Sequence, residues 1–250
     1  WGSNHNGALG VNDEVARSSP TQIPGTTWSK INCGERNAFA LKTDGTLWSW
    51  GRNETGWLGL NEGANPGPSK SSPCQIPGTT WTSNYAVTIQ GVLAIKTDGT
   101  LWAWGQNING SLGQNSQTNY SSPVQVGSES TWSSVNISGE SKVRAIKTDG
   151  TLWSWGYNAK GQLGLNDTTQ RSSPVQVPGT SWTDNIAACQ LSNFAIKSDN
   201  TMWGWGFNYE GALGQNNRTN YSSPKQIPGT TWSGAVCAGQ SSLAVKTDGT

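Results

Sequence analysis

The stretch Lys147-Thr-Asp-Gly-Thr-Leu-Trp-Ser-Trp-Gly-Tyr-Asn-Ala-Lys-Gly-Gln-Leu-Gly164 decides the fold, because close copies of it recur along the whole chain. Its second half, Trp-Gly-x-Asn-x-x-Gly-x-Leu-Gly, begins at Trp1, Trp50, Trp104, Trp155 and Trp205. Self-similarity at a period of about fifty residues is typical of repeat architectures. We therefore interpret each copy as one structural unit.

Each unit has the sequence signals of short strands joined by tight turns. An Asp-Gly pair between two apolar runs indicates a hairpin, because Gly accepts the positive φ of the turn. In one copy Asn200 replaces this Gly, and Asn is the next most tolerant residue. Beside the turn, Phe39 and Leu41 alternate with small or polar residues, as do Trp48 and Trp50. Period two is the period of a strand.

Two further segments complete the unit. A segment based on Thr-Trp-Ser predicts one strand, and Ser-Ser-Pro-x-Gln predicts another that starts at Pro, where no ladder hydrogen bond is lost. The Thr-Trp-Ser segments lie around Trp28, Trp81, Trp132, Trp182 and Trp232, and the prolines are Pro20, Pro73, Pro123, Pro174 and Pro224. Four short strands are the content of one propeller blade. We expect an all-β β-propeller, with residues 1–250 as a single domain of five visible blades.

The run Ala-Ile-Lys-Thr-Asp-Gly-Thr-Leu-Trp-Ser-Trp-Gly-x-Asn-x-x-Gly-Gln-Leu-Gly resembles the repeat of the regulator of chromosome condensation family, and the resemblance covers all five units. It implies four-stranded blades, usually seven of them in that family. The repeats are also similar to those of secreted bacterial and phage-encoded proteins. The His that often precedes the Ala-Leu strand is absent, with Asn37, Val92 and Asn193 there instead, and no basic terminal arm is present. Nucleotide exchange on a small GTPase and chromatin binding are therefore not carried over.

Both ends of the sequence fall inside a repeat. Joining Thr250 to Trp1 would restore the pattern except for a Leu-Trp-x triplet. Five blades that close into a ring are one interpretation, because a ring leaves no long unpaired edge. The other is a piece of a longer chain or assembly, such as a seven-bladed propeller with blades missing here.

Composition limits the function classes. Charged residues make up 12% of the chain and the net charge is +1, so we do not expect nucleic-acid binding through phosphate neutralisation. No apolar run is long enough to predict a membrane span. The chain has one His, His5, and no Cys-x-x-Cys, so neither a metal site nor a cofactor is expected. Low charge with abundant Ser, Thr, Asn and Gly is typical of extracellular proteins, and we expect an extracellular or virion-surface location.

Catalytic residues should break the repeat, because framework residues are already explained. Glu35 and Glu140 occupy similar places on different units, and glycoside hydrolysis needs two facing carboxylates. Solvated loop ends are the preferred interpretation of both. No Ser nucleophile motif, phosphate-binding Gly loop or metal triad is visible. The prediction is a protein that is not an enzyme, with glycan hydrolysis as the least favoured function.

Binding is the better-supported hypothesis. Positions vary inside Trp-Gly-x-Asn-x-x-Gly, and we call the one before the Asn the first slot and the one directly after it the second slot. The first slot holds Ser3, Arg52, Gln106, Tyr157 and Phe207, and the second slot holds His5, Glu54, Ile108, Ala159 and Tyr209. Loops on a rigid scaffold carry function, and aromatic residues and Arg are frequent recognition anchors. The predicted binding residues are Arg52, Trp57, Tyr157, Phe207, Tyr209, Tyr120 and Tyr221.

Packing of these side chains on neighbouring loops is the alternative for each of them. As a group they predict a recognition or structural module that binds a protein partner. A lectin that stacks cell-surface glycans on its aromatic rings is the second hypothesis. It is less favoured because a multivalent lectin should repeat its site in each blade, whereas the slots differ from unit to unit.

Overall fold

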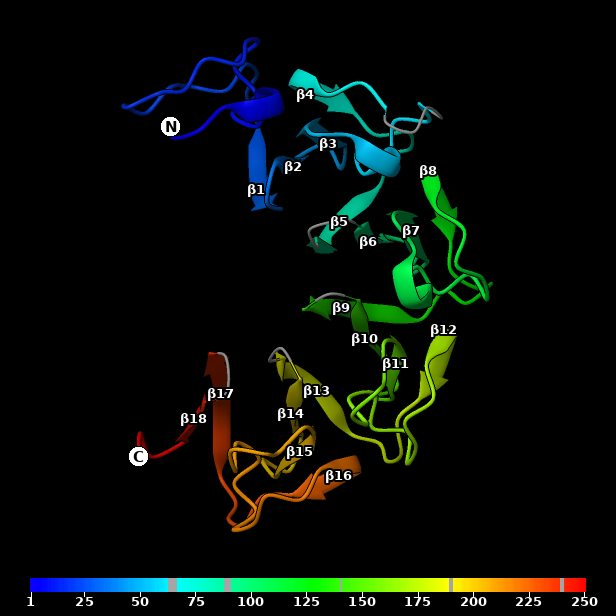
Figure 1. Ribbon diagram of the computed structural model, residues 1–250, viewed down its shortest axis with the longest axis vertical. Helices are drawn as coiled ribbons and strands as arrows, with labels where there is room; N and C mark the ends of the chain where they lie inside the picture. The colour runs from blue at the N-terminus through cyan, green and yellow to red at the C-terminus, as the bar shows by residue number, and fades with distance from the viewer. Residues whose placement is uncertain (63–66, 88–90, 140, 189–190, 239–240) are drawn as a thin grey trace. The chain divides into compact units, whose positions relative to one another are not determined.

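A computed structural model describes residues 1–62, 67–87, 91–139, 141–188, 191–238 and 241–250 (Figure 1). The described residues form antiparallel sheets, and the predicted all-β fold of four-stranded blades is confirmed. The first sheet contains β1 (Trp28–Cys33), β2 (Asn37–Lys42), β3 (Leu47–Gly51) and β4 (Lys70–Gln75), and the second contains β5 (Trp81–Val87), β6 (Gly91–Lys96), β7 (Leu101–Gly105) and β8 (Tyr120–Gln125).

The remaining sheets repeat this order along the chain. The third contains β9 (Trp132–Ser138), β10 (Lys142–Lys147), β11 (Leu152–Gly156) and β12 (Arg171–Gln176), and the fourth contains β13 (Trp182–Ala188), β14 (Ser192–Lys197), β15 (Met202–Gly206) and β16 (Tyr221–Gln226). The fifth has two strands, β17 (Trp232–Ala238) and β18 (Ser241–Lys246). Among the described residues, helical structure is limited to the single turns η1 (His5–Gly7), η2 (Glu54–Gly56) and η3 (Ile108–Gly110).

The contacts divide the chain into two compact units. Unit 1 comprises Trp1–Asn107 and Thr118–Ser130, and unit 2 comprises Ile108–Gln117 and Thr131–Thr250. Unit 1 therefore holds the first two sheets, and unit 2 holds the other three. The prediction that residues 1–250 form a single domain stays a prediction.

The hairpin motif forms as predicted, and its residues have separable roles. Gly45 and Asn200 both have positive φ, at 78° and 60°, so the steric interpretation of the Asn substitution is confirmed. Asp44 Oδ1 accepts hydrogen bonds from the backbone N–H and the hydroxyl of Thr46, and the Thr46 hydroxyl accepts one from the indole N–H of Trp48. The turn thus holds its own Trp in place.

The Lys of the motif lies against two Trp rings. The ammonium of Lys42 is 4.8 Å from the ring centroid of Trp28 and 4.2 Å from that of Trp48. Such cation–π contacts contribute about 0.5–2 kcal/mol, depending on burial. Lys96, Lys147 and Lys197 each make the same pair of contacts in their own sheets.

The predicted strand at Ser-Ser-Pro needs two corrections. Around Pro20 no strand forms, and only Arg17 pairs there, in an isolated bridge with Gly2. In the other copies the Pro lies inside the strand rather than at its start, as Pro73 does in β4. These are edge strands with a register shift opposite the Pro, so the missing N–H breaks no ladder hydrogen bond.

The core of each unit lies between adjacent sheets. In unit 1, Phe39 and Leu47 of the first sheet pack with Tyr85 and Trp104 of the second. In unit 2, Ile146 and Leu152 of the third sheet pack in the same way with Trp182, Ala195 and Trp205 of the fourth. Full burial of a large apolar side chain contributes about 2–3 kcal/mol, so contacts between sheets supply much of the stability of each unit.

Candidate functional site

The loop that follows the third strand of each blade, here called the third-strand loop, is built around one buried Asn. Asn158 Oδ1 accepts a hydrogen bond from the Leu163 backbone N–H at 2.9 Å, and its Nδ2 donates to the Asp167 and Thr169 carbonyls. Asn208 holds its loop in the same way, with Leu213 as the donor. The motif needs Asn because one amide must both accept and donate.

A Gly then presses the third-strand loop onto the next sheet at Gly7, Gly56, Gly110 and Gly161, whereas Gly211, after β15, meets only Asn217 of its own loop. A Cβ on Gly161 would lie 2.6 Å from Ser222 Cα, and one on Gly56 would lie 2.5 Å from Ser121 Cα. Backbone hydrogen bonds of 2.7 Å join the same segments, from Asn166 to Ser222 and from Asn61 to Ser121. The fold therefore fixes the Asn and the Gly and leaves the two slots on either side of the Asn free to vary.

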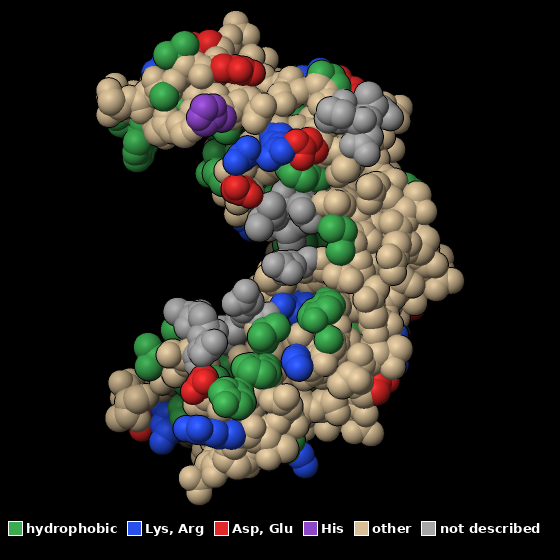
Figure 2. Space-filling view, in the orientation of Figure 1, with side chains coloured by type: hydrophobic (Ala, Val, Ile, Leu, Met, Phe, Trp, Pro, Cys, Tyr) green, Lys and Arg blue, Asp and Glu red, His purple; other side chains and the backbone are tan. Residues whose placement is uncertain are grey.

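In unit 2 the slots present aromatic rings. Phe207 and Tyr209 stack with their centroids 6.1 Å apart and their planes at 20°. Tyr209 is 62% exposed and Tyr157, on the preceding third-strand loop, is 37% exposed. Figure 2 shows hydrophobic side chains, together with Lys and Arg, over the part of unit 2 that holds the third and fourth sheets. Of the predicted binding residues, Tyr157 and Tyr209 are exposed, and Phe207 is half-buried beneath its stacking contact with Tyr209.

In unit 1 the loop after β3 carries an ion pair at the equivalent positions. Arg52 forms an ion pair with Glu54, and its guanidinium lies over the Trp57 ring, 5.5 Å from the centroid. Trp57 itself is only 6% exposed. The structure thus places Trp57 in the interior, with Arg52 covering it, so this ring adds no exposed surface.

Tyr120 and Tyr221 occupy a third environment. They lie half-buried at the start of β8 and β16, opposite Gly105 and Gly206 in the sheet register. The hydroxyl of Tyr221 accepts a hydrogen bond from Asn217 Nδ2 at 2.9 Å. The position of both rings is therefore set by their edge strands rather than by the slots.

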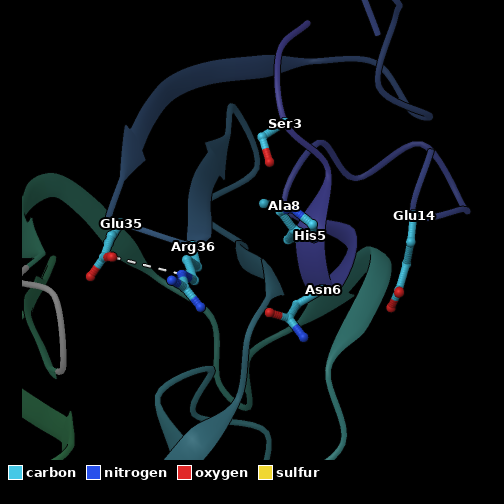
Figure 3. Close-up of a pocket in the computed structure, with 7 residues that line it drawn as sticks. All are labelled: Ser3, His5, Asn6, Ala8, Glu14, Glu35 and Arg36. Atoms are coloured by element: carbon cyan, nitrogen blue, oxygen red, sulfur yellow. Dashed lines mark ion pairs between the residues drawn. The ribbon is translucent and has the colours of Figure 1, made fainter. Parts of the chain in front are cut away.

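Unit 1 also contains a polar pocket that the sequence analysis did not identify. Its volume is about 490 Å³, and its lining residues are Ser3, His5, Asn6, Ala8, Glu14, Glu35 and Arg36. In Figure 3, Glu35 and Arg36 lie side by side with an ion pair of 3.7 Å between them, and Glu14 points away at the other end. The pocket combines both charge signs with the only His of the chain. A clue was available in the sequence: a β1–β2 turn and a third-strand loop belong at the same end of a blade.

The residues considered for catalysis are not assembled by the described part of the structure. Glu35 is exposed at the β1–β2 turn, and Glu140 lies outside the described residues. A search of the described residues finds no group of three or more His, Cys, Asp or Glu that could hold a metal ion. The same residues include no helix long and apolar enough to cross a membrane.

Comparison with known proteins places these features in a family. The model of the regulator of chromosome condensation (RCC1) repeat matches residues 1–41, 44–88, 98–140, 149–191 and 199–245. The chain is 30% identical over 187 residues to the human probable E3 ubiquitin-protein ligase HERC6, covering 71% of this chain and 18% of that protein. It is 30% identical over 188 residues to the ultraviolet-B receptor UVR8 of Arabidopsis thaliana, covering 72% of this chain and 42% of that protein. It therefore spans less than half the length of these two relatives.

Two solved structures show the same fold. Human WBSCR16 superposes with a TM-score of 0.76 at 19% identity, over 98% of this chain and 66% of that one. Prp20p from Saccharomyces cerevisiae, described with its binding to Gsp1p and histones, superposes with a TM-score of 0.61 at 17% identity, over 99% of this chain and 78% of that one.

Proposed function

Because this chain belongs to the regulator of chromosome condensation repeat family, we propose that it is a non-enzymatic recognition module that binds a protein partner through its third-strand loops. The observation that carries the proposal is the stacked pair of Phe207 and Tyr209, with Tyr157 exposed on the preceding loop. A buried Asn, Asn158 or Asn208, sets the backbone of each of these two loops, so the fold gives no reason for aromatic residues in these slots. Exposed rings on a rigid loop are effective anchors for a protein surface.

The slots of the chain itself provide the matched substitutions for a test. Ser3 occupies the first slot and Ala159 the second slot in other copies. Phe207→Ser, Tyr157→Ser and Tyr209→Ala therefore introduce residues that the framework already accepts. We expect each of these variants to keep the unfolding midpoint of the wild-type protein.

The partner can be identified with a photo-crosslinking phenylalanine analogue at position 209. We expect a discrete protein adduct that excess unlabelled wild-type protein competes away. Once the partner is known, Phe207→Ser and Tyr209→Ala should each weaken binding about 30-fold, which is typical of an anchor residue. Arg52→Ser, at the same slot in unit 1, should change affinity less than about twofold. Equal losses at all three positions, or none, would contradict the assignment to unit 2.

A glycan array on the same variants tests the alternative ligand. Sugar binding by the wild-type protein that is lost in the aromatic variants would replace the protein partner with a lectin function. We place the partner outside the cell or on a virion surface, and the support is the low fraction of charged residues, 12%. Recovery of the native protein from cell lysate alone would contradict this location.

A further inference from the structure

Arg144 is a buried cation at an apolar position of the repeat. The residues in the same register of the other four units are Phe39, Leu93, Phe194 and Leu243. Arg144 is only 1% exposed, and burial lowers the pKa of its guanidinium to about 9. The ion pairs of the described residues include none with Arg144, and burying a charge that lacks an opposite charge disfavours the folded state. Packing alone therefore does not account for this residue.

The guanidinium joins two sheets of unit 2. It donates to the Ser138 hydroxyl of β9 at 3.0 Å and to Asn193 Oδ1 of β14. Both partners are buried. Asn193 is itself unusual, because the corresponding positions of the other sheets hold Ala38, Val92, Val143 and Ser242. Two polar residues, Arg144 and Asn193, thus replace the repeat pattern together and are joined by a hydrogen bond, while Nε of Arg144 is buried without a hydrogen-bond partner among the described residues.

Arg144 also determines which way the Asn193 amide faces. With Arg144 donating to its Oδ1, the amide must direct Nδ2 to the opposite side, because the two atoms sit on one planar group. There Nδ2 donates to the Gln162 carbonyl at 2.6 Å, beside the indole N–H of Trp205 at 3.0 Å. The side chain of Gln162 in turn accepts a hydrogen bond from the Lys160 backbone N–H at 2.7 Å.

This chain of hydrogen bonds ends in the third-strand loop that carries Tyr157. Other third-strand loops have only part of this hydrogen-bond chain. The carbonyls of Ala8 and Ser111 accept the indole N–H of Trp50 and Trp155. The residues that correspond to Asn193 in those sheets are Ala38 and Val143. Neither has a side-chain donor.

We propose that Arg144 is a positioning residue, which acts through Asn193 and Gln162 to fix the third-strand loop that presents Tyr157. Its value for binding rests on the proposed function, but its effect on the loop does not. Arg144 lowers the stability of the core but holds one third-strand loop in a defined conformation.

Amide hydrogen exchange tests this positioning without a partner. Arg144→Leu introduces the residue found at Leu93, and Phe194→Leu is the matched control one sheet away. In Arg144→Leu we expect the Lys160 amide to exchange about tenfold faster, the factor for loss of one hydrogen bond, while the urea midpoint stays level or rises. In Phe194→Leu the midpoint should fall and the Lys160 amide should follow the rest of unit 2.

Gln162→Ala and the double variant separate positioning from general support. Ala212 occupies the same place in the next loop, so the framework accepts this change. If Arg144 acts through Gln162, the double variant should exchange at Lys160 no faster than Gln162→Ala alone. The proposal would be overturned if the exchange effects of the two substitutions multiply in the double variant, or if the Lys160 amide of Arg144→Leu exchanges as in the wild type. A lower urea midpoint of Arg144→Leu with a uniform loss of amide protection would also overturn it. Loss of partner binding with a normal Lys160 amide would instead concern only the proposed function.

Discussion

The third-strand loops of the two units have one backbone design but opposite surfaces. After β3 in unit 1, Arg52 pairs with Glu54 and covers the buried Trp57. After β15 in unit 2, Phe207 and Tyr209 stack and Tyr209 is 62% exposed. The comparison shows that the position of an aromatic residue in the loop, rather than its type, decides whether its ring is buried or exposed. Trp57, directly after the loop Gly, turns inward, whereas Tyr157 and Tyr209, beside the loop Asn, turn outward.

The substitution with the largest expected loss of stability tests whether the backbone after the third strand is the same in unit 1 and unit 2. A Cβ on Gly51 would lie 2.3 Å from the Arg36 carbonyl oxygen, and one on Gly156 would lie 1.8 Å from that of Ser141. Both residues have positive φ. Gly51→Ala and Gly156→Ala should each lower the free energy of unfolding by about 3 kcal/mol or more, through strain and overlap together. Urea unfolding measures this loss.

Gly2→Ala is the control for that prediction. Gly2 has a similar φ of +108°, but a Cβ on this residue would meet no heavy atom within 4 Å. The loss there should be about 1–2 kcal/mol, from backbone strain alone. Tolerance of Ala at Gly156 with a large loss at Gly51 would show that the two units differ in backbone as well as in surface.

The next effect contrasts how each unit links its sheets through polar groups. In unit 1 the Tyr85 hydroxyl donates toward the carbonyls of Lys30 and Phe39, each at 3.3 Å, and burial raises the pKa of this hydroxyl. Tyr85→Phe should cost about 1 kcal/mol, while Arg144→Leu in unit 2 costs nothing. Tyr209→Phe, with an exposed ring, is the control and should be neutral. Equal losses for Tyr85→Phe and Arg144→Leu would remove the contrast.

The Arg144 link has a pH dependence of known sign. Burial lowers its folded pKa to about 9, well below the ordinary value of a guanidinium, so the unfolded chain binds more protons above pH 9. Stability from this group is therefore lowest at neutral pH and rises as the pH passes 9. The unfolding midpoint of Arg144→Leu should exceed that of the wild-type protein by less at pH 10 than at pH 8. A gap that widens over this range would contradict the origin of the cost.

A smaller effect should be the same in both units. The ammonium of Lys96 lies 4.1 Å from the Trp102 centroid, and that of Lys197 lies 4.7 Å from the Trp203 centroid. Lys96→Met and Lys197→Met should each lower the free energy of unfolding by about 0.5 kcal/mol, measured by thermal unfolding. Lys160→Met, at an exposed loop position, should cost less. A loss in one unit only would mean that the hairpin framework is not equivalent in the two.

The smallest effect is an acid dependence shared by all the hairpins. The hydroxyl and backbone N–H of Thr100 lower the pKa of Asp98 below 3.8, and Thr201 does the same for Asp199. The stabilisation is present above about pH 4 and is lost as the pH falls through the lowered folded pKa. Asp98→Asn and Asp199→Asn should each flatten the fall of the urea midpoint below pH 4. Parallel curves for variant and wild type would contradict this.

The framework could be predicted from the sequence because its residues repeat with a physical reason. The positive φ at Asn200 and the strand pairs around Trp50 followed from residue type and alternation alone. The place of Pro73 inside β4 did not, because a strand edge is a property of the sheet rather than of the segment. The burial of Trp57 was also missed, since its cover, Arg52, lies five positions earlier in the chain.

The candidate site was less predictable for a related reason. The exposed Tyr157 and Tyr209 and the half-buried Phe207 were found from slots that differ between copies. The polar pocket around His5 and Glu35 and the link from Arg144 to Asn193 depend on segments that meet only after folding. A departure from the repeat at Arg144 was visible, but its partner forty-nine residues away was not.

The contact between a loop Gly and the Ser of the following sheet gives the chain a direction. The loop Gly of one blade contacts the Ser of the following blade, and the Ser of that first blade is contacted by the preceding one. This contact has the same form in both units and is not symmetric. A blade of this kind is a repeat that can be exchanged for another. If one blade is duplicated or exchanged, the Gly and Ser residues that join it to its neighbours come with it. Its two slots are not needed for this contact, so they can change to form a new recognition surface.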